Sequence, residues 1–143
     1  MNVAVILQSK GGNVVTARPE TPVREIIRLL HDAAIGAVVI SADRLRVEGI
    51  VSERDIVRAL AESGDAVLDK QAAEVMTRDV VTCTAGDTVA QLMSVMTEGR
   101  FRHLPVCEDG AMIGIVSIGD VVRLRVEEVE HEAEALREYV THG

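Results

Sequence analysis

The chain has 143 residues, a formal net charge of −8 and a hydrophobic content of 48%. Length and composition predict a single compact unit with a sizeable core, and the presence of only one Phe and one Tyr means that this core is aliphatic. The acidic balance argues against a nucleic-acid surface, which needs clustered Lys and Arg, and no stretch reaches the roughly 18 apolar residues that cross a bilayer. We therefore expect neither nucleic acid nor a membrane among the partners.

The first predicted element is a short N-terminal helix. Val3, Ile6 and Leu7 have the spacing i, i+3, i+4, which is typical of an amphipathic helix, and Gly11-Gly12 would end it. No basic flank precedes this apolar run, so we do not expect a signal peptide.

The rest of the chain contains an internal repeat. Val15-Thr16 returns as Val81-Thr82 at an offset of 66 residues, and Gly-Ile-Val-Ser-Glu-Arg-Asp at 49–55 returns as Gly-Ile-Val-Ser-Ile-Gly-Asp at 114–120 at an offset of 65. This period is too long for a solenoid unit and too short for an independent domain. It predicts two half-domains that fold against each other and form a cleft with matched sites.

Each repeat predicts the order strand, helix, strand, strand, helix. The first helix of each repeat is expected to begin at Thr21 or Asp87 as N-cap, with Pro22 at the first helical position. The last helices should begin near Asp55 and Asp120, and a short helix at residues 70–76 should lie in the linker. The predicted strands are 13–17, 37–40 and 49–52 in the first repeat, and 80–84, 103–106 and 113–117 in the second.

A second apolar pattern follows the second repeat. Its apolar residues are spaced 4, 3, 4, 3, 4, which is a heptad stripe on a helix, and glutamates cover the other faces. Such a stripe could pack on its own domain or across a dimer, and we favour a homodimer. The stripe consists of Val122, Val126, Val129, Ala133, Leu136 and Val140.

These features together resemble a tandem pair of CBS domains, also called a Bateman module, of the small stand-alone bacterial type. The resemblance rests on the order of elements, on the ending Gly-hydrophobic-hydrophobic-Ser-x-x-Asp of each repeat, and on Met76-Thr77 before the second repeat. It implies an α+β fold with two βαββα half-domains related by pseudo-two-fold symmetry, plus a long C-terminal helix. The domains would be residues 1–68 (first repeat with the N-terminal helix), 69–125 (second repeat) and 126–143 (helical extension).

The two Ser-x-x-Asp endings leave two interpretations open. Ser52 and Asp55, like Ser117 and Asp120, could form a capping box at a helix N-terminus. The same geometry suits a nucleotide, because a helix N-terminus favours phosphate and a carboxylate accepts hydrogen bonds from ribose hydroxyls. The resemblance implies that each Asp binds ribose and that Ala37 and Val38, or His103 and Leu104, offer backbone groups to adenine, with Val15 and Val81 on the purine faces.

The two sites are expected to be unequal. The second repeat has clustered cationic residues at Arg100, Arg102 and His103, and Arg is suited to phosphate. The first repeat has Gly36 at the corresponding place, but Arg54 and Arg18 could reach a phosphate there; each of these arginines could equally be a solvated surface charge. One site could hold a mononucleotide and the other a dinucleotide. The full set of predicted nucleotide-binding residues is Thr16, Arg18, Gly36, Ala37, Val38, Ser52, Arg54, Asp55, Thr82, Thr84, Arg100, Arg102, His103, Leu104, Pro105, Ser117, Ile118, Gly119 and Asp120.

The sequence predicts a binding module and no enzyme. It contains no nucleophile with an adjacent base, no phosphate loop and no metal motif, and Cys83 and Cys107 are expected to be reduced thiols in a cytoplasmic protein. The expected function is a regulatory sensor that binds AMP or NAD(H), with ATP as a further candidate and no metal, and that signals energy or redox state to an unidentified target protein. The alternatives are a structural CBS pair with degenerate sites, or a nucleotide-processing enzyme.

Overall fold

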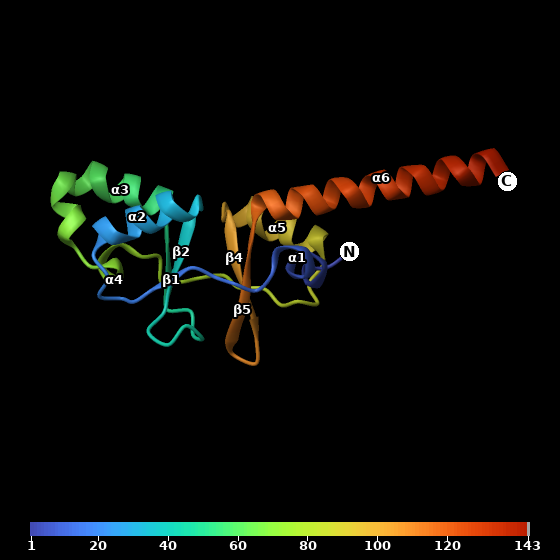
Figure 1. Cartoon of the computed structure of the whole chain (residues 1–143). Coiled ribbons are helices and arrows are strands. Elements are labelled where there is room, and N and C mark those ends of the chain that lie inside the picture. Colours follow the sequence, from blue (N-terminus) through green and yellow to red (C-terminus); the bar gives the residue numbers. More distant parts are fainter. Residues whose placement is uncertain (143) are drawn as a thin grey trace.

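The computed structural model describes residues 1–142 and has two lobes, from one of which a long helix extends (Figure 1). The first lobe holds one three-stranded sheet in the order β1-β2-β3, with β1 parallel and β3 antiparallel to β2. Its elements are β1 (Thr16–Ala17), α2 (Val23–Ala33), β2 (Ala37–Ile40), β3 (Gly49–Ser52), α3 (Glu53–Ser63), the 3-10 helix η1 (Gly64–Asp69) and α4 (Ala72–Val75).

The second lobe is built on a β-hairpin. Strands β4 and β5 pair antiparallel, and the register shifts between Val106 and Cys107. The elements of this lobe are α1 (Val3–Lys10), α5 (Val89–Gly99), β4 (His103–Glu108), β5 (Ala111–Ser117) and α6 (Ile118–His142). The α+β class, the two similar halves and the long C-terminal helix agree with the expected fold.

Two predicted strands are shorter in the structure. The strand expected at 13–17 is reduced to Thr16–Ala17, and the one expected at 80–84 is reduced to a single parallel bridge between Cys83 and Val106. In the second case the ladder ends because the next residue turns: the Thr84 N–H donates to the Asp87 carboxylate at 2.9 Å. These first strands are therefore short edge segments.

Both expected N-caps lie one residue too early. Helix α2 begins after Pro22, which has extended backbone angles and makes no side-chain cap. Helix α5 begins after Thr88, whose hydroxyl accepts from the Gln91 N–H while the Gln91 side chain accepts from the Thr88 N–H. The prediction of Asp87 as N-cap is wrong because a complete capping box is available one residue later.

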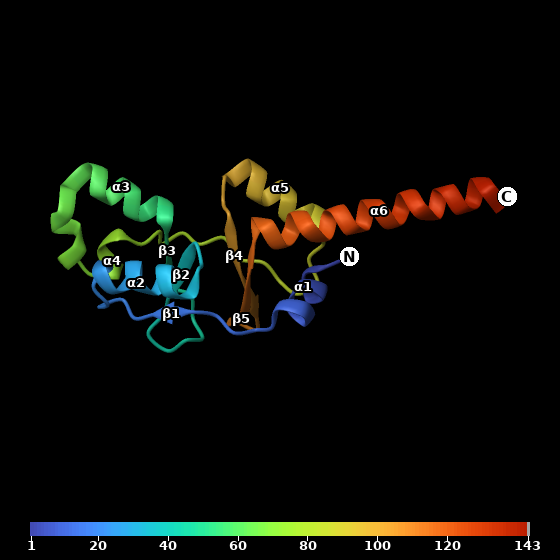
Figure 2. The same ribbon diagram turned by 45° about the horizontal axis from the view of Figure 1, so that its top comes forward.

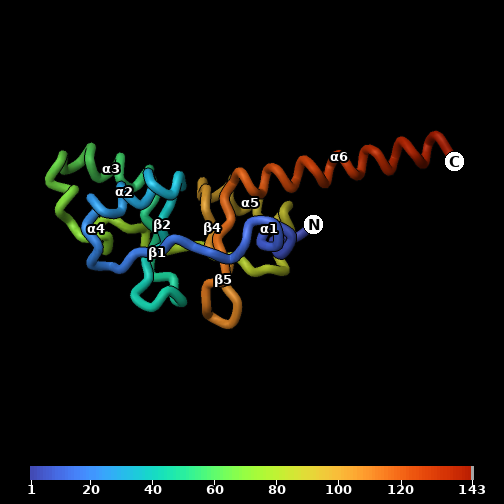
Figure 3. The backbone as a smooth tube through the Cα atoms, in the orientation of Figure 1, coloured from blue at the N-terminus to red at the C-terminus, as the bar shows by residue number. Residues whose placement is uncertain are grey.

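The segment before each repeat packs on the lobe of the other repeat. Helix α1 contributes Val3 and Ile6 to the core of the second lobe, and α4 contributes Ala72 to that of the first. Figure 3 shows the backbone crossing between the lobes from α1 to β1 and again from α4 to α5. Packing thus exchanges these flanking segments, whereas domain boundaries at 1–68 and 69–125 follow the order of the chain.

This exchange explains the glycine in the repeated motif. A Cβ on Gly49 would lie 2.9 Å from the carbonyl oxygen of Thr77, and a Cβ on Gly114 would lie 2.6 Å from Leu7 Cδ2. Thr77, which precedes the second repeat, and Leu7 of α1, which precedes the first, therefore lie directly on β3 and β5. In the first lobe this contact is also a backbone pairing, because Ile50 and Thr77 exchange N–H···O bonds of 3.0 and 2.8 Å.

Helix α6 leaves the body of the protein after its first two turns. Only Val121 and Leu124 of this helix are buried, whereas Leu136 is 63% and Val140 74% exposed. Figure 2 shows the distal part of α6 extending beyond all other elements. The heptad stripe thus lies on a helix, as predicted, but it is not covered by its own domain. The last residue of the predicted extension 126–143 lies outside the described residues.

No helix within residues 1–142 combines the length and apolar character needed to cross a membrane.

Candidate functional site

A cavity of about 730 Å³ lies between the two lobes. Pockets that bind small molecules typically have volumes of about 300–1,000 Å³, so this cavity is large enough for such a ligand. Both lobes contribute to its wall through the ends of strands and the first turns of the following helices. The segment from Thr77 to Val81, which crosses between the lobes, completes the wall. The lining residues are Gly36, Ile50, Ser52, Glu53, Arg54, Asp55, Arg58, Thr77, Asp79, Val80, Val81, Gly99, Arg100, Phe101, Arg102, His103, Ser117 and Ile118.

The two Ser-x-x-Asp turns are both complete capping boxes. The Asp55 carboxylate oxygen Oδ2 accepts from Ser52 N–H at 2.8 Å and from Ser52 Oγ at 2.9 Å. The Asp120 Oδ2 accepts from the same groups of Ser117 at 2.9 and 3.0 Å. The capping interpretation is therefore correct for both turns, and any ligand role must use the acceptor positions that remain.

Asp55 keeps a free acceptor position on its carboxylate. Its Oδ1 accepts one hydrogen bond, from Thr77 Oγ1 at 3.0 Å, and Arg58 Nη1 lies 3.8 Å away. A carboxylate oxygen has about two acceptor positions, so one remains on Oδ1. Asp55 is only 6% exposed, and it is one of the residues that line the cavity.

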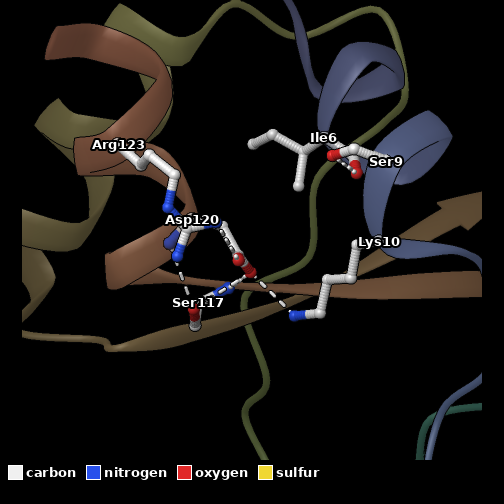
Figure 4. A network of polar contacts seen from close by, with 6 residues as sticks. All are labelled: Ile6, Ser9, Lys10, Ser117, Asp120 and Arg123. Carbon is white, nitrogen blue, oxygen red and sulfur yellow. Dashed lines mark hydrogen bonds and ion pairs between the residues drawn. The ribbon is translucent and has the colours of Figure 1, made fainter. Parts of the chain in front are cut away.

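Asp120 makes a different third contact. Lys10 Nζ, at the end of α1, donates to Asp120 Oδ2 at 2.7 Å, and Arg123 lies 4.0 Å from Oδ1. Figure 4 shows Lys10 reaching from α1 to the Asp120 carboxylate, which also contacts Ser117. Burial alone would raise the pKa of Asp120, but the hydrogen bonds from Lys10 and Ser117 outweigh it and hold the pKa below its ordinary value.

The cavity wall is rich in arginine. Two arginines come from α3 and two from the segment between α5 and β4, and they converge from opposite lobes: Arg54 Nη1 donates to the carbonyl oxygen of Arg100 at 3.4 Å. Three carboxylates share the wall with them. In a chain with a net charge of −8, this local excess of cations favours an anionic ligand. The four arginines are Arg54, Arg58, Arg100 and Arg102.

His103 lies at the contact of the two lobes. A Cβ on Gly36 would lie 3.2 Å from His103 Cε1, so Gly36 leaves the space that the ring needs. Burial lowers the pKa of His103, and the Lys10 ammonium adds to this effect. The imidazole is therefore neutral at neutral pH. It can offer one donor and one acceptor to a ligand, but no charge.

Apolar side chains provide a second kind of surface in the cavity. Val80, Val81 and Phe101 line it, and Val81 is 36% exposed. A flat aromatic base would bury its faces against such side chains. Val15, the other valine expected on the purine, packs against the core of the first lobe and does not line the cavity.

The structure brings about half of the predicted site residues together. The cavity is lined by Gly36, Ser52, Arg54, Asp55, Arg100, Arg102, His103, Ser117 and Ile118. The others lie elsewhere: Val38 and Leu104 point into the two cores, and Arg18 bonds the carbonyl oxygen of Ala42 and pairs with Glu20. Outside the lining are Thr16, Arg18, Ala37, Val38, Thr82, Thr84, Leu104, Pro105, Gly119 and Asp120.

Several cavity residues were absent from the predicted set. Thr77 and Asp79 reach the cavity because the crossing segment packs on the first lobe, which the sequence order does not indicate. Arg58 lies one helical turn after Arg54 on α3, so its i, i+4 spacing was an available signal. Phe101 lies between the predicted site residues Arg100 and Arg102, and this position was the available signal for it.

The cysteines are inert thiols in this structure. Burial raises the pKa of Cys83 to about 12, so this thiol stays protonated, and the thiolate is the reactive form. Burial raises the pKa of Cys107 as well. Among residues 1–142, the His, Cys, Asp and Glu side chains form no cluster of three that could hold a metal ion.

Comparison with known proteins identifies the family. The CBS domain family matches the chain twice, over residues 9–62 and 72–127. A mitochondrial CBS domain-containing protein of Arabidopsis thaliana, CBSX3, is 31% identical over 149 aligned positions, which cover 99% of this chain and 72% of that protein. The chain therefore belongs to the CBS-domain family, and its two lobes are a tandem CBS pair.

Two solved structures are close in fold. A CBS-domain containing protein from Agrobacterium tumefaciens has 47% sequence identity and a TM-score of 0.84, and the match covers 87% of this chain and 99% of that one. The CBS domain pair of protein MJ0100 was solved in complex with 5′-methylthioadenosine and S-adenosyl-L-methionine. It has 26% identity and a TM-score of 0.78, with 90% of this chain and 98% of that one covered.

Proposed function

We propose that this CBS pair is a non-catalytic sensor module that binds an adenine nucleotide in the cleft between its lobes and reports to a separate target protein. The ribose hydroxyls would lie on Asp55 and the phosphate among the cleft arginines. The observation that carries the proposal is the convergence of four arginines and one nearly buried carboxylate on a single cavity in an acidic chain.

The adenosine part of the ligand is supported by a relative and by the wall of the cavity. Both compounds bound to the MJ0100 pair contain adenosine. In this chain Val80, Val81 and Phe101 offer apolar surface to a purine, and the free acceptor position on Asp55 Oδ1 suits a sugar hydroxyl. The neutral His103 adds a donor and an acceptor without opposing charge.

The phosphate part of the ligand rests on the arginines of this chain. Guanidinium groups bind phosphate through paired hydrogen bonds, and the Arg54 side chain already reaches across the cleft to the backbone of Arg100. The present partner of the Arg54 guanidinium is this backbone carbonyl at 3.4 Å, a long contact that a phosphate would replace with charge-assisted bonds. AMP is the smallest ligand that uses both parts, and NAD(H) and ATP share the same chemistry.

Calorimetric titration with AMP, adenosine and CMP tests the proposal. We expect AMP to bind, adenosine to bind more weakly because it lacks the phosphate, and CMP not to bind. Arg102→Gln should lower AMP affinity about tenfold to a hundredfold, which is the effect of one charged hydrogen bond. The control is Arg123→Gln on α6, outside the cavity wall, which should leave the affinity unchanged.

Three results would contradict this function. Equal affinities for AMP and CMP would exclude a base-reading site, and absence of binding by all three compounds would favour a structural CBS pair. Release of hydrolysis products from AMP over hours would favour an enzyme.

The second part of the proposal is a homodimer formed through α6. Val129 is 46% and Leu136 63% exposed on a helix that leaves its own domain, and an isolated amphipathic helix gains most of its stability from a packing partner. Replacing both residues by Asp should convert a dimer to a monomer in multi-angle light scattering. As a control, His131→Asp with Arg137→Asp adds acidic charge off the stripe and should leave a dimer. A dimer that persists in the first variant would place the interface on other helices.

A further inference from the structure

The two pseudo-equivalent Ser-x-x-Asp turns differ in the side chain that reaches the carboxylate from the segment preceding the other repeat. At the first turn this is the neutral hydroxyl of Thr77, 3.0 Å from Asp55. At the second turn it is the ammonium of Lys10, 2.7 Å from Asp120. Lys10 and Thr77 are 67 residues apart, one or two residues more than the repeat offsets, so they come from corresponding segments of the two halves and not from equivalent positions.

The cavity follows the same asymmetry. At the first turn it reaches all four residues from Ser52 to Asp55 and also Thr77. At the second turn it reaches Ser117 and Ile118 but neither Gly119, Asp120 nor Lys10. The side of the cleft on which Lys10 holds the carboxylate is therefore the side on which the space for a ligand stops.

We infer that Lys10 determines which half of the module binds ligand: it occupies Asp120 as an internal cation, so that one nucleotide binds per chain, on the Asp55 side. This inference rests on the proposed function. The Lys10 ammonium already donates a charge-assisted hydrogen bond to Asp120 Oδ2 and so weakens this carboxylate as an acceptor for a ribose hydroxyl, whereas a ribose at Asp55 meets only the neutral hydroxyl of Thr77. Loss of one charged hydrogen bond weakens binding roughly tenfold to a hundredfold, enough to leave the second site empty when the first is filled.

Lys10 is held in a position from which it can occupy Asp120. It is the last residue of α1 before Gly11, and α1 is held on the second lobe by Val3 and Ile6 in the core. Figure 4 shows Ile6 on the same side of α1 as the Lys10 contact. The ammonium thus comes from a fixed helix end, and only its side chain must rotate to release Asp120.

The test uses the two lysines of the chain as a matched pair. Lys10→Met removes the ammonium and keeps the length of the side chain, and Lys70→Met is the same change in the linker, outside the cavity wall. Calorimetric titration with AMP should give one equivalent per chain for the unmodified protein and for Lys70→Met. It should give two equivalents for Lys10→Met, the second within about a hundredfold of the first in affinity.

Each other outcome has a defined meaning. Two equivalents in the unmodified protein, one equivalent in Lys10→Met, or loss of binding in Lys10→Met would each overturn the role of Lys10. Absence of binding in all the proteins would instead overturn the proposed function. Asp120→Asn in the Lys10→Met background should return the stoichiometry to one, which ties the added site to this carboxylate.

Discussion

Replacing Asp55 by Ala is expected to lower AMP affinity about tenfold to a hundredfold and to reduce the free energy of unfolding by about 1–3 kcal/mol. The two effects have separate causes. Binding loses the remaining acceptor position of a carboxylate that lines the cavity. The fold loses the partner of Ser52 N–H, Ser52 Oγ and Thr77 Oγ1, and these donors lie where water has little access because Asp55 itself is 6% exposed. Calorimetry and urea unfolding measure the two effects independently.

The matched control for this prediction is Asp120→Ala. It removes an equivalent capping box and should reduce the free energy of unfolding by about 1 kcal/mol, the usual effect of losing an N-cap. Its AMP affinity should not change, since Asp120 does not line the cavity. Equal losses of affinity in the two variants would mean that both turns bind ligand. Unchanged affinity in Asp55→Ala would remove the ribose from this carboxylate.

The repeat made much of the fold predictable from sequence. The strands at 37–40 and 49–52 have the predicted bounds, because short apolar runs between turns have few alternatives. The weaker first strands were overestimated: a Val-Thr pair has strand propensity, but tertiary pairing reaches only Cys83 in the second repeat. Local pattern indicates which residues prefer to be extended, and the neighbouring strand decides how many are paired.

The cleft was less predictable than the turns that form it. Both Ser-x-x-Asp turns were visible in the sequence because their residues are close along the chain. Thr77 and Lys10 were not, because each serves the lobe of the other repeat. Such an exchange is a long-range packing outcome, and only Gly49 and Gly114, which the crossing segments cover, record it in the sequence.

The strand residues of the predicted site were expected to act through their backbone groups. Val38 and Leu104 are fully or almost fully buried, so their side chains contribute to the two cores. Any role in binding would have to come from their backbone groups, which substitution does not remove. Mutation of such positions therefore reports on stability, and a loss of binding there would need to be separated from a loss of folded protein.

Replacing Leu104 by Ala is expected to reduce the free energy of unfolding by about 2–5 kcal/mol, the range for a truncated core leucine. Leu104 is 1% exposed in the core of the second lobe, so the missing atoms leave a cavity. The control is Leu136→Ala on the free part of α6, where the side chain is 63% exposed; at protein concentrations low enough to keep the chain monomeric it should change the free energy by less than about 0.5 kcal/mol. Urea unfolding followed by circular dichroism measures both.

In the folded Leu104→Ala protein, AMP affinity should match that of the unmodified chain, because the side chain faces the core and not the cleft. A cost below about 1 kcal/mol, or a specific loss of affinity, would mean that β4 presents this side chain to the ligand.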